Sequence, residues 1–384
     1  MVDLESSTAV VPVTKSLAHG ANTFASHVRL AFSEKPTDYT GELPRLLTDI
    51  AMATRAIGAS VRRNGIPSSM FETDPNARSY SDDASSTSPL SDLSSPPAAP
   101  GLRSVGSSAS LLSTLSSRDT YVEFSAEVAT RILFRSLYHD GHLCIMLSKT
   151  SEEPLMPPDN TPFGNYVLTF SALEKDPVFS YESVCGTVFS IYKRTSAAGN
   201  RGTVEDLLRK GSEQVAAGYV MYGNATVLVY SMGQGVHAFT MHPSIKEFFL
   251  HPTPLRIPSG VKSLFLHYFQ EPLWDEQTRK LVESLTGEGD YEIQYSNNLL
   301  ADYHHFLAIG GLAAFPKSMT FPDGPVHYLS VAAPLAFLTE QAGGSATDGS
   351  VRILDKKVKS IHETTALYLG SADVLKVVDK FLSS

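Results

Sequence analysis

The first regular hydrophobic pattern in the chain lies in residues 42–63. Apolar residues recur there with the spacing of one helical face, and two arginines followed by a glycine are typical of a helix C-terminus. The apolar positions are Leu43, Leu46, Leu47, Ile50, Met52, Ala53, Ile57 and Val61. This pattern predicts a long amphipathic helix.

A second helical pattern spans residues 121–137, and the pattern then changes to short strands. These β-branched and aromatic runs are separated by Gly and Asn, and the tetrapeptide at 232–235 is typical of a hairpin. The runs are residues 143–148, 165–170, 185–194, 215–223, 225–231 and 236–242. They predict a large sheet with mostly consecutive strands.

A proline-rich break at 251–260 precedes a different pattern. Strand-like runs at 262–269, 313–316, 326–332 and 366–371 alternate with helix-like runs at 274–285, 296–311, 334–344 and 372–383. Such alternation predicts a layered α/β arrangement.

One segment, from about Ser79 to Arg118, is rich in Ser and Pro. It has too few apolar residues to offset the entropy of ordering, so we expect a disordered insertion. Two Ser-Pro pairs, at 88–89 and 95–96, leave open whether it is a tolerated surface insertion or a phosphorylated regulatory segment.

The chain has 384 residues and a formal net charge of −9, which argues against a nucleic-acid or acidic-lipid binder. Its two cysteines, Cys144 and Cys185, lie in apolar runs, as expected in a reducing compartment. No stretch of eighteen apolar residues predicts a membrane span, and the N-terminus lacks a signal or transit pattern. We therefore expect a cytoplasmic protein.

Several spaced segments resemble the class I fructose-1,6-bisphosphatase family, in that family's order and over nearly the whole chain from Asn22. They read TGELPRLLTDI (40–50), GTVFSIY (186–192), VAAGYVMYG (215–223), HPSIKEFFL (242–250), ADYHHFLAIGG (301–311), AFLTEQAGG (336–344) and SIHETTALYLGS (360–371). The resemblance implies an α/β fold, a layered αβαβα sandwich with two domains, and a tetrameric assembly.

The resemblance also implies a domain organisation. Residues 1–72 would be an N-terminal segment with the first helix of a regulatory domain, and 73–118 the disordered insertion. Residues 119–258 would complete an AMP-type regulatory domain, and 259–384 would form a sugar-phosphate domain.

Members of this family hydrolyse the 1-phosphate of fructose 1,6-bisphosphate with two or three divalent ions. Their metal ligands come from a DPLDGSS motif, an upstream SEE pair and a Glu in a YECNP segment. By the resemblance, these metal positions are occupied here by Lys149, Thr150, Ser171, Glu174 and Val331. Only one of the five is a carboxylate, and hard divalent cations need several oxygen ligands.

The family's sugar-phosphate contacts are also changed. The matching positions carry His267, Gln270, Gln294, Tyr295, Phe315 and Pro325, of which only Tyr295 retains the family residue. The changes remove an Arg and a Lys that would face phosphate.

More of the family's AMP site is retained. Thr40, Gly41, Glu42, Leu43 and Tyr166 match, whereas Asn165 replaces Lys and Lys193 replaces Arg. Free amides at a helix N-terminus can still bind phosphate, although the lost cation would weaken it. A second interpretation is that these residues simply cap the helix.

Two other metal sites are conceivable. A shifted alignment would recruit Glu152, Glu153, Glu174 and Asp176, but odd shifts turn strand side chains to the wrong face. Adjacent His304 and His305 diverge by ~100° on a helix, and the His237/His242 spacing matches no ligand pattern.

The sequence therefore predicts a family member of carbohydrate metabolism with a degenerate active site and no cofactor. It would act as a regulatory or structural partner, in a tetramer of its own or with a family paralogue, and would bind a sugar phosphate or AMP without turnover. The alternative is an active bisphosphatase of gluconeogenesis with relocated carboxylates and Mg²⁺.

Overall fold

The computed structural model describes residues 22–33, 41–63, 124–175, 184–266, 268–287, 291–296 and 298–382. The chain divides into two compact units, residues 1–58 with 125–384 and residues 59–124. The second unit contains the end of helix α2 (Glu42–Val61), and the serine-rich segment 73–118 lies outside the described residues. The domain boundaries expected from the sequence stay a prediction.

The first unit contains a seven-stranded sheet whose strands follow chain order. Only β1 and β2 are parallel, and every later neighbour is antiparallel. The strands are β1 (Leu143–Ser148), β2 (Tyr166–Lys175), β3 (Cys185–Lys193), β4 (Gln214–Tyr222), β5 (Thr226–Ser231), β6 (His237–Met241) and β7 (Phe248–Leu250). The predicted sheet of consecutive strands is confirmed, including the hairpin turn at 232–235.

A second sheet has five strands in the order β12-β14-β10-β8-β9. Its strands are β8 (Ser263–Leu266), β9 (Glu292–Gln294), β10 (Leu312–Phe315), β12 (Ser345–Thr347) and β14 (Leu367–Gly370). β8 is parallel to both β9 and β10, whereas β14 is antiparallel to β10 and β12. Two short strands, β11 (Val326–His327) and β13 (Thr364–Thr365), pair separately.

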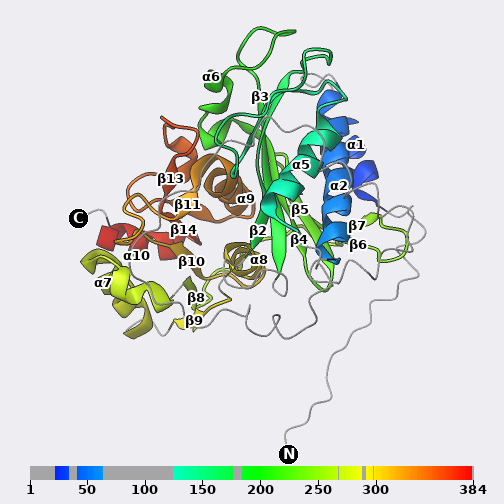
Figure 1. Cartoon of the computed structure of the whole chain (residues 1–384). Coiled ribbons are helices and arrows are strands. Elements are labelled where there is room, and N and C mark those ends of the chain that lie inside the picture. Colours follow the sequence, from blue (N-terminus) through cyan, green and yellow to red (C-terminus); the bar gives the residue numbers. More distant parts are fainter. Residues whose placement is uncertain are drawn as a thin grey trace, which may run out of the picture. The chain divides into compact units, whose positions relative to one another are not determined.

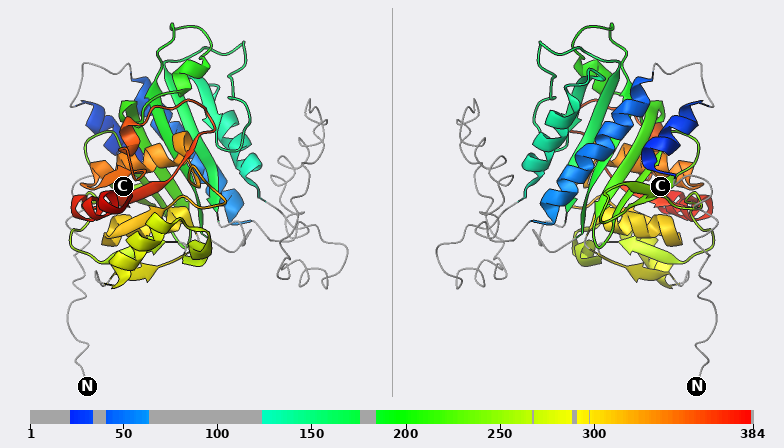
Figure 2. Two further views of the ribbon diagram at one scale, coloured as in Figure 1. Left: turned by 90° about the vertical axis from the view of Figure 1, so that its left-hand side faces the viewer. Right: turned by 90° about the vertical axis from the view of Figure 1, so that its right-hand side faces the viewer.

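Helices cover both outer faces of this unit and fill the space between its sheets (Figures 1 and 2). On one side of the large sheet lie α1 (Phe24–Ser33), α2 and α5 (Ala126–Leu137). Between the sheets lie α8 (Leu299–Ile309) and α9 (Ala333–Gln341), and on the far face of the small sheet lie α7 (Glu276–Gly287) and α10 (Ala372–Leu382). This order of layers confirms the predicted αβαβα sandwich. The short helix α6 (Val204–Leu207) follows β3 in the chain.

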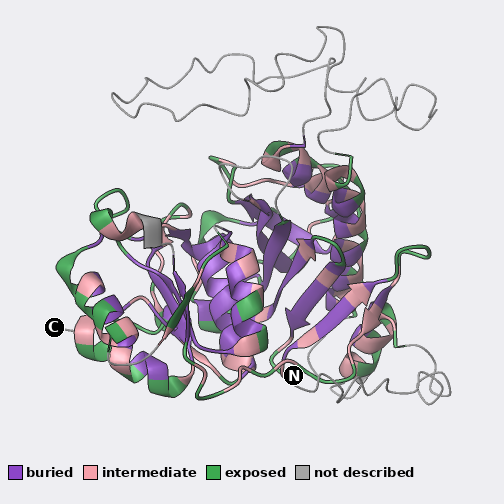
Figure 3. Ribbon diagram, turned by 90° about the horizontal axis from the view of Figure 1, so that it is seen from below, coloured by how far each residue is buried: buried purple, intermediate pink, exposed green. Residues whose placement is uncertain are grey.

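The helices pack with their apolar faces toward the sheets. Helix α2 buries one face, including Leu43, Leu46, Leu47 and Ile50, against the sheet. Ser125 caps α5, because its Oγ accepts a hydrogen bond from the Val128 amide. Figure 3 shows that the strands are largely buried, whereas exposed residues gather on the outer helices and loops.

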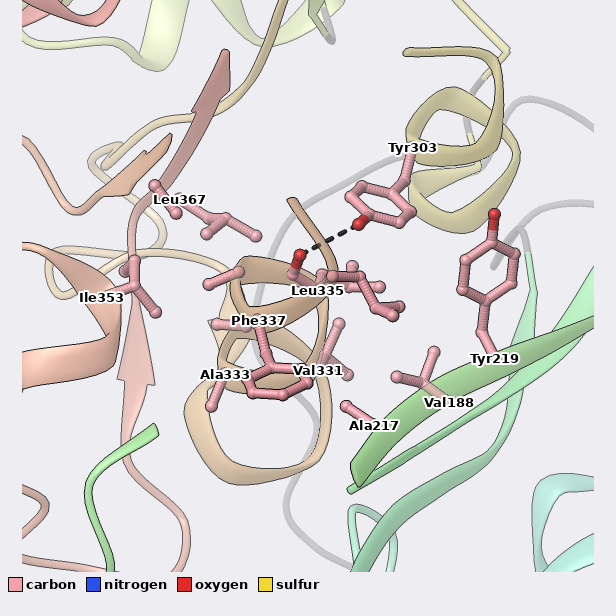
Figure 4. Packing of buried hydrophobic residues seen from close by; sticks show 14 of the residues in the cluster. Val188, Ala217, Tyr219, Tyr303, Val331, Ala333, Leu335, Phe337, Ile353 and Leu367 are labelled. Carbon is pink, nitrogen blue, oxygen red and sulfur yellow. Dashed lines mark hydrogen bonds between the residues drawn. The ribbon is translucent and has the colours of Figure 1, made fainter. Parts of the chain in front are cut away.

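Helix α9 is the centre of the main core (Figure 4). Residues 333–339 are all buried, because one sheet lies on each side of the helix. Side chains of the large sheet such as Val188 and Ala217 approach it from one side, and Ile353 and Leu367 from the other. Tyr303 of α8 donates a 2.9 Å hydrogen bond to the Leu335 carbonyl. The polar hydroxyl thereby fixes α8 against α9.

Two predicted strands are shorter than expected. The run 326–332 is a strand only at Val326–His327, and Tyr328–Ala332 forms a π-type turn, η6, that leads into α9. Every residue of η6 is buried, so hydrophobicity alone does not distinguish strand from helix there. The run 262–269 ends as a strand at Leu266 and is followed by the 3₁₀ helix η5 (Tyr268–Leu273). Further 3₁₀ turns are η4 (Gly211–Glu213) and η7 (Ile353–Asp355).

Helix α1 and strands β7 and β9 have no counterpart in the sequence prediction. Helix α1 has only ten residues, and its packing depends on distant partners: the Phe24 ring lies 5.0 Å from that of Tyr230 and 5.2 Å from that of Phe239. No helix of the part described is long and apolar enough to cross a membrane.

Candidate functional site

A bulge in strand β2 brings together two of the residues that occupy the expected metal positions, Ser171 and Glu174. The register between β2 and β3 shifts between Ser171 and Glu174. Bulges of this kind redirect side chains and are frequent beside active sites. The Ser171 hydroxyl donates a 2.5 Å hydrogen bond to Glu174 Oε1, so the two side chains are in direct contact.

Lys149 completes this cluster from the end of β1. Its backbone amide donates to the Phe170 carbonyl at 2.9 Å, which extends the β1–β2 ladder by one residue. Its Nζ atom lies 2.7 Å from Glu174 Oε1. The Glu174 side chain is only 9% exposed, whereas that of Lys149 is 38% exposed. A cation and a carboxylate therefore form an ion pair where the resemblance places metal ligands.

Thr150 belongs to a neighbouring group of hydroxyls. Its Oγ1 lies 3.1 Å from Ser148 Oγ and 3.3 Å from Thr130 Oγ1, and the latter two atoms are 3.0 Å apart. This group connects α5 to the end of β1. Val331, the fifth metal position, is 1% exposed and belongs to the apolar core. Neither residue adds a carboxylate to the cluster.

Two histidines that the sequence analysis did not select lie beside the ion pair. Burial, followed by the nearby charge of Lys149, lowers the pKa of His327 to about 4, so this imidazole is neutral near pH 7. Its ring centre is 6.3 Å from that of His362, whose Nε2 lies 2.7 Å from the Glu152 carbonyl oxygen. The pairing of β11 with β13 brings the two residues together across 35 positions of sequence, a relationship without a local sequence signal.

Unpaired polar atoms remain at this cluster. Within the described residues, His327 Nε2 and Ser330 Oγ are buried and have no hydrogen-bond partner. Each such atom lowers the free energy of unfolding by ~1–3 kcal/mol unless a water molecule or a ligand forms a hydrogen bond with it. The cluster thus has two polar atoms without a partner in the described part of the chain, beside an ion pair between Lys149 and Glu174.

The relocated carboxylates are not brought together by the described part of the chain. Glu152 and Glu153 are exposed in the turn after β1, whereas Glu174 is buried within β2, and Asp176 lies outside the described residues. No group of three or more acidic, His or Cys side chains suitable for a metal ion occurs among the described residues. The other histidine candidates separate as well: His304 Nδ1 lies 2.7 Å from the Tyr219 hydroxyl, whereas His305 packs on Phe265.

Three of the residues assigned to sugar-phosphate contacts lie at or just after the ends of neighbouring strands of the small sheet. Strands β8, β9 and β10 are mutually parallel, so their carboxyl ends lie at one edge of the small sheet. Gln270 follows β8 in η5, Gln294 ends β9 and Phe315 ends β10. Phe315 is 6% exposed in the core, Tyr295 is 40% exposed, and Pro325 precedes β11. His267 lies outside the described residues.

The AMP-type residues meet at the start of α2. Asn165 Nδ2 donates to both Glu42 carboxylate oxygens, at 3.3 and 3.1 Å. Tyr166 and Lys193 are direct cross-strand partners in the β2–β3 ladder, and Leu43 is buried. Gly41 has a φ of 77°, and Thr40 lies outside the described residues. The amide that replaces the family's Lys thus contacts a carboxylate at the helix N-terminus.

The two cysteines are buried free thiols on β1 and β3, as the sequence predicted. Burial raises the pKa of both Cys144 and Cys185 to about 11. Thiols in this state are poor nucleophiles.

Comparison with known proteins matches most of the chain to one protein family. The sequence model described as "Fructose-1-6-bisphosphatase, N-terminal domain" matches residues 126–253, and the model of the corresponding C-terminal domain matches residues 265–383. The chain is 38% identical over 252 residues to "Fructose-1,6-bisphosphatase class 1" of Chloroherpeton thalassium, covering 64% of this chain and 72% of that protein. It is 39% identical over 260 residues to the protein of the same name from Nitratidesulfovibrio vulgaris, covering 65% and 77%.

Two solved structures have the same fold as this chain. The crystal structure of Leishmania major fructose-1,6-bisphosphatase in holo form superposes with a TM-score of 0.72 at 21% identity, covering 94% of this chain and 99% of that one. The apo form superposes with a TM-score of 0.73.

Proposed function

Because this chain belongs to the fructose-1,6-bisphosphatase family, we propose that it is a member of carbohydrate metabolism that has lost the metal-dependent phosphatase reaction. In this proposal it binds a sugar phosphate or AMP without turnover and acts as a regulatory or structural partner.

The ion pair between Lys149 and Glu174 carries the proposal. The divalent ions of the family would lower the pKa of the attacking water and neutralise phosphate charge. Here the ammonium group of Lys149 lies 2.7 Å from the one carboxylate of the cluster. Two unit charges ~4 Å apart near a protein surface interact by about 4 kcal/mol, so this ammonium would repel a divalent ion by more.

The remaining donors do not fit divalent ions either. Ser171 Oγ and Glu174 provide hard oxygen atoms, but Val331 is apolar and Thr150 hydrogen-bonds to other hydroxyls. Mg²⁺ requires near-octahedral oxygen coordination, usually with carboxylates. We therefore propose no metal cofactor and derive no catalytic step through one.

The alternative is an active 1-phosphatase of gluconeogenesis that uses relocated carboxylates. The names of the bacterial relatives, at 38–39% identity, favour it. It requires Asp176 to join Glu152, Glu153 and Glu174 around Mg²⁺.

Phosphate release decides between the two. Purified protein would be incubated with fructose 1,6-bisphosphate and either Mg²⁺ or Mn²⁺, with and without a chelator. We expect no metal-dependent release. A metal-dependent rate that Glu174→Gln abolishes, and that Glu283→Gln on the exposed face of α7 leaves intact, would overturn the proposal.

The oligomeric state and the subcellular location are also proposals. By family resemblance we propose a tetramer, either of this chain alone or with an active paralogue. Native mass measurement after co-expression with an active family member from the same organism tests this, and a monomer under both conditions would contradict it. We propose that the protein is located in the cytoplasm, because both cysteines are free and buried.

A further inference from the structure

A cavity of about 260 Å³ lies between α1 and the β5–β6 hairpin, away from the Lys149 cluster. Its lining combines two imidazoles, a phenol, a thioether and an amide with apolar surface: His27, Leu30, Ala31, Tyr230, Met232, Gln234, Gly235 and His237. Helix α1 packs on the outer face of the large sheet, and this hairpin is part of that sheet (Figure 1). None of the lining residues is acidic or carries a permanent positive charge.

Two of the lining residues, His27 and His237, lie directly against each other. Their ring centres are 4.5 Å apart, with 55° between the ring planes. Two imidazoles that bind one ion through bonds of ~2.1 Å have ring centres roughly 5 Å apart. The observed separation of the ring centres is therefore close to that of two imidazole ligands of one ion.

One of the two rings also lies close to the backbone of its own hairpin. The backbone of Gln234, in the turn between β5 and β6, lies within hydrogen-bonding reach of the His237 ring. A neutral imidazole that donates from one nitrogen presents a lone pair on the other, and this arrangement typically orients metal-binding histidines. Burial lowers the pKa of both rings, that of His27 to about 4, so both are neutral near pH 7.

Tyr230 provides an independent sign that the cavity is incomplete without a ligand. Its hydroxyl is buried and has no hydrogen-bond partner within the described residues. Its ring centre lies 5.9 Å from that of His27 and 6.3 Å from that of His237. An ion with its bound water in the cavity would offer a partner to this hydroxyl.

We propose that this cavity is a binding site for a late transition-metal ion, Zn²⁺, Cu²⁺ or Ni²⁺, with the imidazoles of His27 and His237 as ligands. Imidazole nitrogen favours these ions, whereas Mg²⁺ and Ca²⁺ need oxygen ligands that the lining lacks. The Met232 thioether is suited to copper, and water completes the coordination. The bound ion would cross-link α1 to the large sheet.

Isothermal titration of the untagged, metal-free full chain with ZnCl₂, NiCl₂ or CuCl₂ tests the site. We expect one strong site per chain for at least one of these ions and none for MgCl₂. His27→Gln and His237→Gln should each weaken it at least tenfold. His242→Gln, in the exposed turn after β6, is the matched control and should bind as the unaltered chain does.

A second measurement on the unaltered chain avoids dependence on variant folding. Diethyl pyrocarbonate modifies accessible imidazoles, and mass spectrometry of peptides locates the modification. The bound ion should protect His27 and His237 but not His242. The proposal is overturned if none of the three ions binds, or if they bind while both histidines are modified at unchanged rates.

Discussion

The Nζ atom of Lys149 lies 2.7 Å from Oε1 of Glu174, and the Ser171 hydroxyl donates to the same oxygen at 2.5 Å. One oxygen of a buried carboxylate thus receives both an ammonium and a hydroxyl group of the protein. This relationship makes the proposed loss of metal binding directly testable by substitution.

Replacing Lys149 with glutamate should create affinity for divalent ions. The change Lys149→Glu removes the cation and places a second carboxylate beside Glu174, which supplies hard oxygen ligands. We expect Mn²⁺ to bind the variant at least tenfold more tightly than the unaltered chain in isothermal titration. Lys149→Gln is the control that removes charge without adding a ligand. Equal Mn²⁺ affinity in all three proteins would contradict this explanation.

Restoring cations at the start of α2 should strengthen AMP binding. Asn165→Lys replaces the amide that donates to Glu42, and Lys193→Arg provides bidentate contact with phosphate. The double variant should bind AMP at least tenfold more tightly, measured by titration calorimetry. Lys376→Arg on the exposed α10 helix should have no effect. If the double variant also leaves AMP affinity unchanged, the helix start serves only as a cap.

Asp49 should make stability depend on pH. Burial, followed by the neighbouring Asp140, raises its pKa from 3.8 to about 6 in the folded protein. The folded state therefore binds this proton more tightly than the unfolded state, and the associated stability is lost as pH rises from about 4 through 6. Because Asp49 is partly exposed, we expect a loss on the order of 1–2 kcal/mol.

Urea unfolding at about pH 4 and about pH 7 measures this effect. Asp49→Asn should be stabilised relative to the unaltered chain at the higher pH more than at the lower one. Asp373→Asn, whose side chain is 85% exposed, is the control. A stability difference between Asp49→Asn and the unaltered chain that is the same at both pH values would refute the prediction.

Asp206 should be a major contributor to stability. It is fully buried, and its carboxylate accepts hydrogen bonds from the backbone amides of Thr195, Ser196 and Thr203 and from the Ser196 hydroxyl. Burial by itself would raise the pKa of Asp206, but together these hydrogen bonds outweigh it and hold the pKa well below its usual range. Asp206→Ala leaves buried donors unpaired and should reduce the free energy of unfolding by about 3 kcal/mol.

The neighbouring Glu205 offers a matched control, because it lies on the same short helix and is exposed. Glu205→Ala should change the urea midpoint little. Similar midpoints for the two variants would show that the hydrogen bonds of Asp206 contribute no more than a surface charge.

Local sequence patterns were sufficient to predict those helices and strands whose hydrophobic periodicity differs from that of the neighbouring segments. Helix α2 follows from its apolar spacing, and strands β2 to β6 follow from β-branched runs separated by Gly and Asn. The prediction was wrong at residues 328–332, because a segment that is buried on all sides has no polar face to mark its period. The short helix α1 was missed because Phe24 packs against residues some 200 positions away.

The sequence by itself determined the family, the layered fold and the identity of the residues at the expected metal positions. Only the tertiary structure decided what those residues do: that Lys149 pairs with Glu174, that His327 and His362 lie beside them, and that His237 faces His27 rather than His242. Periodicity records which face of an element is buried. It carries no information on which side chains meet across distant elements, because sheet register, the β2 bulge and helix docking set those contacts.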